Sequence, residues 1–127
     1  MLLASAVLLA VVGLVHSVLA ELTMFRQLPR ATGLAPLGFP PIAGAAQSPV
    51  LTVRACWHLL TVFGWTFALI LGRFAAQPTL TTGDRFIVQS IAAALAAAAV
   101  VMFVGTRGKH LGWAAFAAAA ALAYLGL

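Results

Sequence analysis

Four long apolar stretches run through the chain, and shorter polar or proline- and glycine-rich connections separate them. The stretches cover roughly residues 2–22, 50–73, 85–105 and 111–127. A helix needs about 20 predominantly apolar residues to cross a bilayer, and the fourth stretch is barely long enough. The pattern predicts an all-α integral membrane protein, a single domain in which four transmembrane helices form a bundle.

The composition agrees with this class of protein. Of the 127 residues, 64% are hydrophobic and 7% are charged, and the mean hydropathy is +1.10, which excludes an ordinary soluble domain. No Lys or Arg precedes the first apolar stretch. A secretory signal normally carries such a basic region, so we expect residues 2–22 to remain as a membrane helix.

The longest connection, residues 23–49, is rich in proline and glycine but also carries many apolar side chains. The prolines and glycines preclude a continuous helix. We expect the segment to lie along the membrane surface or over the helix ends. Loops of this length are often functional or bind a partner, and a plain interfacial spacer is an equal alternative.

Basic residues dominate the charge and lie in the connections, with 7 Lys+Arg against 2 Asp+Glu and a formal net charge of +5. In these places they orient helices and meet lipid headgroups, so no nucleic-acid partner is expected. The first and third connections with their helix ends carry Arg26, Arg30, Arg54, Arg107 and Lys109, against Arg73 and Arg85 in the second. This bias predicts that residues 23–49 and 106–110 are cytoplasmic and that both termini are periplasmic.

A polar stripe opens the second apolar stretch. Arg54, His58, Thr61 and Trp65 follow one another at steps of four, three and four residues, so they share one face of a helix. Ionisable groups are costly in hydrocarbon, so this face should turn toward other helices or a water-filled pocket. Together with Trp57 it forms a candidate polar and packing cluster.

Small residues mark the faces on which helices should meet. On residues 2–22 they recur at steps of three and four: Ala6, Ala10, Gly13, Ser17 and Ala20. On the second stretch, Ala68 and Gly72 continue the face of the polar stripe. Such spacing predicts a seam along which two backbones approach closely.

Three histidines and a carboxylate should gather at one end of the bundle. His16 lies five residues before Glu21, and His58 lies four after Arg54, so both imidazoles are expected at the same depth, with His110 in a connection on the same side. This donor set, His16, Glu21, His58 and His110, could bind zinc or another transition metal. Alternatively, His16 and His58 could be the axial ligands of a haem.

Two non-metal alternatives stay open for the same residues. The histidines could lock the helix ends together, with Arg54 paired to Glu21 or to headgroup phosphates. They could also form a short proton relay of His16, Glu21 and His58 in a small oligomeric transporter.

Covalent chemistry is the least supported class. Ser17 directly follows His16, so we expect it to point to another helix face, without the base that a nucleophilic serine needs. The single cysteine, Cys56, cannot form an intrachain disulfide and is expected to be a small buried residue. Catalysis is therefore a minority hypothesis.

Short motifs suggest a family resemblance across most of the chain outside residues 23–49. These are Gly13-Leu-Val-His16-Ser17 with Glu21, then Trp57-His58, then Gly108-Lys109-His110 ahead of Trp113. The combination resembles a group of small four-helix bacterial inner-membrane proteins, most of them uncharacterised. The resemblance implies the fold and a bacterial inner membrane, and it implies no activity.

The leading functional hypothesis is a non-catalytic accessory or assembly subunit. It would contact the lipid bilayer and form a homo-oligomer or join a larger membrane complex. The small size of the chain and its alanine- and glycine-rich faces motivate this hypothesis.

Overall fold

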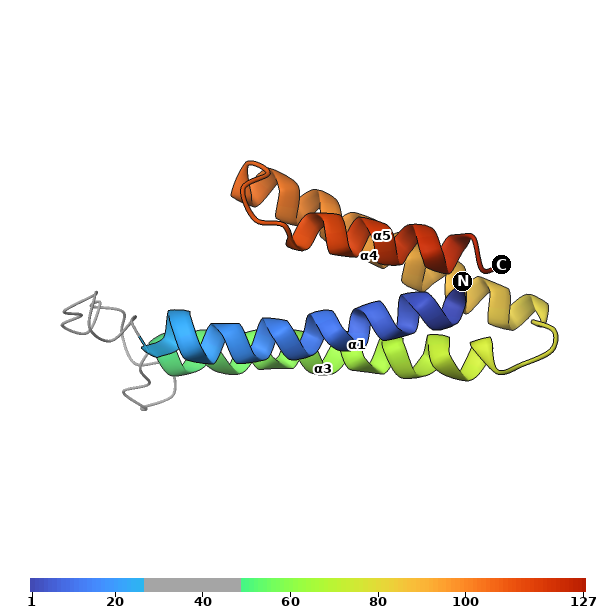
Figure 1. The fold of residues 1–127 in the computed structure, drawn as a ribbon, viewed down its shortest axis with the longest axis horizontal. Coiled ribbons are helices and arrows are strands. Elements are labelled where there is room, and N and C mark those ends of the chain that lie inside the picture. The colour runs from blue at the N-terminus through green and yellow to red at the C-terminus, as the bar shows by residue number, and fades with distance from the viewer. Residues whose placement is uncertain (27–48) are drawn as a thin grey trace, which may run out of the picture. The chain divides into compact units, whose positions relative to one another are not determined.

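The computed structural model describes residues 1–26 and 49–127, and every regular element in these residues is helical. The chain forms α1 (Leu2–Leu19), which continues into a π-helical turn η1 (Ala20–Phe25), then α3 (Pro49–Ala75), α4 (Thr82–Thr106) and α5 (Gly112–Tyr124) (Figure 1). The all-helical prediction is confirmed. Most of the long first connection lies outside the described residues, so its predicted surface position stays a prediction.

Three of these helices are long and apolar enough to cross a membrane: Leu2–Phe25, Leu51–Ala75 and Thr82–Thr106. The fourth, α5, has 13 residues and is shorter than the predicted stretch 111–127. At 1.5 Å per residue it is about 20 Å long. The chain relaxes into turns on either side of it, at Leu111 and after Tyr124.

The chain divides into two compact units. One, here called the core unit, contains Met1–Val12 and Gly64–Leu127; the other, the hairpin unit, contains Gly13–Phe63. The long helices α1 and α3 each contribute to both units.

All four α-helices meet within the core unit. Its fully buried side chains include Leu71, Val88 and Ala119, from α3, α4 and α5. Ser5 of α1 is also fully buried, and its hydroxyl donates to the Ala119 carbonyl at 2.8 Å. The single polar group of this buried set is thereby satisfied by another helix.

The small-residue seam brings α1 and α3 together in the core unit. A Cβ built on Gly72 would lie 3.9 Å from the Ala6 Cβ, an ordinary van der Waals contact. Gly72 and Ala6 therefore meet along the face that the spacing predicts. Close approach of this kind is the main source of packing energy between helices in lipid.

The first turn of α4 is held by a capping box. Thr81 Oγ1 accepts from the Asp84 N–H at 3.2 Å, and Asp84 Oδ2 accepts from the Thr81 N–H at 2.9 Å. The reciprocal cap starts the helix at Thr82, three residues before the predicted boundary at residue 85, because it satisfies N–H groups that would otherwise be unpaired.

The other end of α4 turns sharply into α5. Arg107 adopts a left-handed conformation with φ 52°, and Gly108 follows with φ 73°. The Gly108 N–H donates to the Phe103 carbonyl at 2.8 Å. A Cβ on Gly108 would lie 3.1 Å from the Phe103 ring, so this position needs glycine for both its φ and its space.

From this turn, α5 returns antiparallel along α4 (Figure 1). Trp113, at its start, packs edge-on against Phe103 near the end of α4. Beyond its end, the Leu127 carbonyl accepts from the Arg85 guanidinium in the first turn of α4. Together, α5 and the turns around it thus accompany α4 over nearly its whole length.

Candidate functional site

The centre of the candidate site is an ion pair across the hairpin unit, between η1 and the first half of α3. Arg54 donates twice to Glu21, from Nε to Oε1 at 2.7 Å and from Nη2 to Oε2 at 2.6 Å. This bidentate geometry fits the planar guanidinium to the carboxylate. The two side chains remain 49% and 33% exposed, so the pair lies at the edge of the hairpin.

His58 continues the polar network inward from this ion pair. Its Nε2 lies 2.6 Å from Glu21 Oε1, and its Nδ1 lies 3.0 Å from Ser17 Oγ. Ser17 in turn donates to Thr61 Oγ1 at 2.9 Å, and Thr61 is 4% exposed. Hydrogen bonds therefore connect the exposed Glu21 to a buried hydroxyl within little more than one helical turn.

The network accommodates either charge state of the imidazole. A neutral His58 with its proton on Nε2 donates to Glu21 and accepts from Ser17, and the Ser17 hydroxyl then accepts from Thr61 in place of donating to it. A protonated His58 donates at both ends, while Ser17 donates onward to Thr61. The arrangement can hold a proton on His58 without leaving a ring nitrogen unsatisfied.

His16 lies against Trp57 of α3. The two rings stack with centroids 4.3 Å apart and planes 3° apart, and the Trp57 indole N–H donates to the His16 carbonyl at 3.3 Å. Phe25 meets the Trp57 ring edge-on at 6.0 Å. These three rings form an aromatic cluster that braces η1 against α3.

Ser17 is the functional residue that the sequence analysis missed. The expectation that it points away from the site is wrong, because it lies between His58 and Thr61. The spacing of small residues could have predicted this position, because Ser17 shares the small-residue face of α1 with Gly13 and Ala20, and that face packs on α3.

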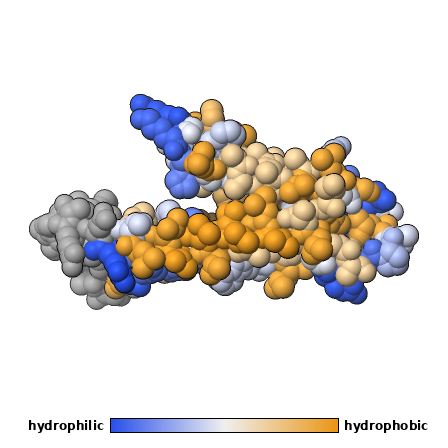
Figure 2. Space-filling model, in the orientation of Figure 1, coloured by the Kyte–Doolittle hydropathy of each residue, from blue (hydrophilic) through white to orange (hydrophobic). Residues whose placement is uncertain are grey.

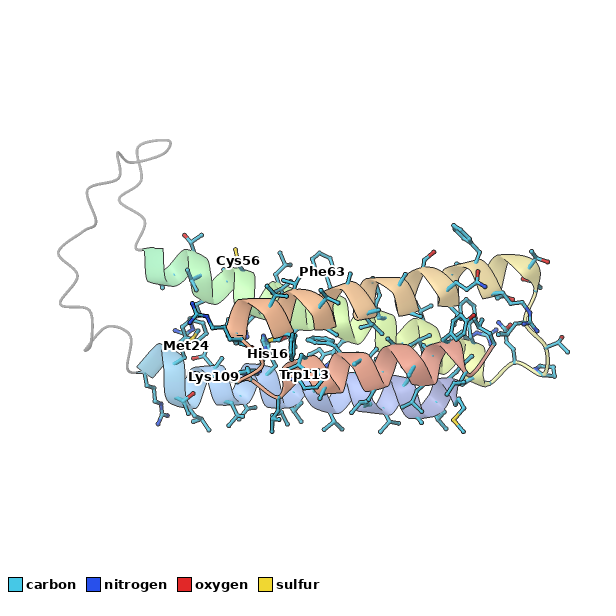
Figure 3. All side chains as sticks on the ribbon, turned by 90° about the horizontal axis from the view of Figure 1, so that it is seen from above. His16, Met24, Cys56, Phe63, Lys109 and Trp113 are labelled. Atoms are coloured by element: carbon cyan, nitrogen blue, oxygen red, sulfur yellow. The ribbon has the colours of Figure 1, made fainter. Side chains whose placement is uncertain are left out.

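The expectation for Cys56 is also wrong. Cys56 is exposed on α3 and points outward from the helix (Figure 3). It follows Arg54 by two residues, which places it about 200° around the helix from the face that contacts α1. Its thiol has no role in the network.

Two predicted residues belong to the core unit instead. Trp65 donates from its indole N–H to the Ala10 carbonyl at 3.2 Å, so it too faces α1. His110 accepts the Gly112 N–H at its Nδ1, 3.0 Å away, within its own turn. The predicted gathering of His110 with the other histidines stays a prediction.

The structure brings together part of the predicted donor set, since His58 meets Glu21, and the predicted metal and haem sites stay predictions. In the two described ranges, no group of three or more His, Cys, Asp or Glu is placed to hold a metal ion. Both ring nitrogens of His58 are engaged by Glu21 and Ser17, and the carboxylate of Glu21 is shared with Arg54. In this arrangement both ring nitrogens of His58 take part in hydrogen bonds between side chains.

Comparison with known proteins finds no matching family model, no matching curated protein and no matching solved structure. The resemblance to small bacterial inner-membrane proteins thus stays a prediction from sequence motifs.

Proposed function

We propose that this protein is integral to a bacterial inner membrane and crosses it four times, with both termini periplasmic and with residues 23–49 and 106–110 in the cytoplasm. Three span-length apolar helices support this proposal. Their outer surfaces carry large apolar side chains, among them Leu69 at 76% exposure and Val101 at 72%, and Figure 2 shows a broad hydrophobic face. Lipid is the environment in which such a surface is stable.

The fourth crossing is supported by the way α5 accompanies α4. Phe103, which Trp113 contacts, lies 18 residues after Arg85, which contacts Leu127. Eighteen helical residues rise about 27 Å, close to the roughly 30 Å of the hydrocarbon core. The short helix and its terminal turns together cover this depth.

Within the membrane, we propose a non-catalytic accessory role, as part of a homo-oligomer or of a larger membrane complex. One observation carries this proposal: the alanines on the outer face of α4 are exposed, namely Ala93, Ala94, Ala96 and Ala97. Alanine gains little from contact with lipid, whereas small side chains let a second helix approach closely. The polar groups of the hairpin support a non-catalytic role because they are engaged with one another.

The test is the mass of the assembly that contains the protein in native membranes. We expect crosslinking and blue-native electrophoresis to show oligomers or a stable complex. Ala97→Leu should shift the population toward monomer, because the larger side chain prevents close approach. Ala118→Leu is the matched control, since Ala118 is also exposed but lies on α5. A wild-type monomer without partners would contradict the proposal.

A second candidate function, proton-coupled transport in an oligomer, is favoured by one specific observation. The hydrogen-bonded series Glu21, His58, Ser17 and Thr61 runs from an exposed carboxylate to a buried hydroxyl. Such a series can pass a proton part of the way along a helix pair. Proton flux into liposomes that disappears in Glu21→Gln and persists in Cys56→Ser would support it, and no flux above empty liposomes would exclude it.

A further inference from the structure

The turn between α4 and α5 carries a cationic cluster that the candidate site does not use. Residues 106–112 include Arg107, Lys109 and His110, all exposed, and contain no acidic residue. No salt bridge involves these three residues in the described parts of the chain. Figure 2 shows strongly hydrophilic atoms gathered at this end of the α4 and α5 pair.

This turn is fixed in shape by its own hydrogen bonds. The Lys109 N–H donates to the Thr106 carbonyl at 3.1 Å, and the Trp113 indole N–H donates to the Gly108 carbonyl at 3.4 Å. His110 is held through Nδ1 by the Gly112 N–H, which places the ring proton on Nε2 as a further donor. The backbone that carries the basic side chains is therefore ordered before an anion binds, which lowers the entropy cost of binding.

Arg107 occupies a position that favours glycine. It adopts the left-handed conformation at the end of α4, which an L side chain rarely takes. The following residue is already glycine and also has positive φ. A backbone cost at an exposed cation suggests that the guanidinium itself is needed there.

Exposed apolar side chains flank Arg107 and Lys109 in the sequence. Leu111 is 79% exposed, Val104 is 67% exposed and Phe103 is 49% exposed. A free inorganic anion gains no binding energy from an apolar surface. A phospholipid gains it, because its acyl chains would contact these apolar side chains while its phosphate meets the charges.

The opposite end of the core unit lacks this combination. There Asp84 accompanies the basic residues, and Arg85 donates to the Leu127 carbonyl. The Asp84 carboxylate lowers the net positive charge at that end, and the bond to Leu127 occupies one of the Arg85 donors. The unit is therefore electrostatically asymmetric, and the α4 to α5 turn is its more basic end.

We propose that the α4 to α5 turn binds the phosphate headgroup of an anionic phospholipid through Arg107 and Lys109, with the His110 Nε2–H as a third donor. Arg107 supplies a planar, always charged fork that matches two phosphate oxygens. Lys109 adds a point charge two residues further along the turn, and Figure 3 shows it at the same end of α5 as Trp113. This inference rests on the proposed membrane insertion.

The experiment measures which lipids the protein retains. The full chain is reconstituted into vesicles of equal parts phosphatidylcholine and phosphatidylglycerol, released in mild neutral detergent, and examined by native mass spectrometry. We expect phosphatidylglycerol to be retained preferentially. Each basic residue at a membrane surface is worth about 1 kcal/mol, so removing two should reduce the preference by about 30-fold.

The variants separate binding from folding. The double change Arg107→Gly with Lys109→Gln should reduce the preference by about 30-fold, while glycine keeps the left-handed turn. Arg73→Gln is the control for losing a cation elsewhere and is compared with Lys109→Gln alone, since Arg73 is an exposed cation in the last turn of α3. It should retain phosphatidylglycerol as the wild type does.

The possible outcomes distinguish this inference from the proposed function. Resistance to alkaline carbonate extraction tests insertion alone, and extraction of the protein would overturn both proposals. An inserted double variant with unchanged phosphatidylglycerol preference overturns only the headgroup site. Inorganic phosphate that displaces the lipid at equal concentration would replace the lipid site with a free-anion site.

Discussion

The two units of the chain are stabilised by different chemistry, although the same two long helices run through both. In the core unit the buried contacts are almost entirely apolar, from Leu71 to Ala119, with one hydroxyl bonded to a carbonyl. In the hairpin unit, side chains of opposite charge and hydrogen-bonding side chains join α1 and η1 to α3. Close packing stabilises the first, and polar pairing specifies the register of the second.

The largest expected effect comes from opening a cavity in the core unit. Leu71→Ala should destabilise the protein by about 2–5 kcal/mol, because the fully buried side chain leaves space that its neighbours cannot fill. Thermal unfolding in detergent measures this cost. Leu69→Ala, at a 76% exposed position on the same helix, is the control and should change little. Equal effects at both positions would contradict the assigned core.

A smaller loss is expected from the hairpin network. Ser17→Ala should cost about 1–3 kcal/mol, because His58 Nδ1 and the buried Thr61 hydroxyl both lose a partner. Adding Thr61→Val should cost less than the sum of the two single changes. A double-mutant cycle on urea or thermal unfolding gives this coupling. Strict additivity would show that the two hydroxyls do not interact.

The ion pair at the edge of the hairpin should contribute less than the inner network. Arg54→Gln should lower the melting temperature by only a few degrees, since both partners are partly exposed and screened by salt. High ionic strength should reduce the difference between this variant and the wild type. A difference that is independent of salt would argue that the pair is more deeply buried.

The smallest effect, and the opposite sign, is expected at the end of α4. Arg107→Gly should leave stability in neutral detergent unchanged or raise it by up to about 1 kcal/mol, because glycine adopts the left-handed conformation freely. Gly108→Ala is the contrasting variant and should be destabilising, since its Cβ would lie 3.1 Å from Phe103. The same melting assay compares the two. A clear loss of stability in Arg107→Gly would mean that its side chain supports the fold.

Most of the fold could be predicted from hydrophobic runs, because length and composition alone identify helices that can cross a bilayer. The boundaries were harder to predict, since they depend on local bonds. The reciprocal cap of Thr81 and Asp84 moves the start of α4, and a π-helical turn extends α1 to Phe25. Hydropathy predicts neither the π-helical hydrogen bonding of that turn nor the end of α5 at Tyr124.

The candidate site was only partly predictable. Spacing identified the stripe of Arg54, His58 and Thr61, because a regular helix fixes which residues share a face. The same reasoning predicts that His16 and Ser17 cannot both face α3, since the side chains of consecutive helical residues point about 100° apart. In the hairpin unit both contact α3, one through Trp57 and one through His58. An interface between two helices is wider than a single line of residues.

The π-helical turn makes the position of Glu21 depend on an exact residue count. It spans Ala20–Phe25, and the Thr23 hydroxyl bonds back to the Leu19 carbonyl. A π turn holds about one residue more than an α turn, so deleting one residue here would let the backbone return to α geometry and would redirect the side chains within the turn, Glu21 among them. In related chains, a single-residue gap at this place would therefore signal a change in the direction of Glu21 rather than a change in span length.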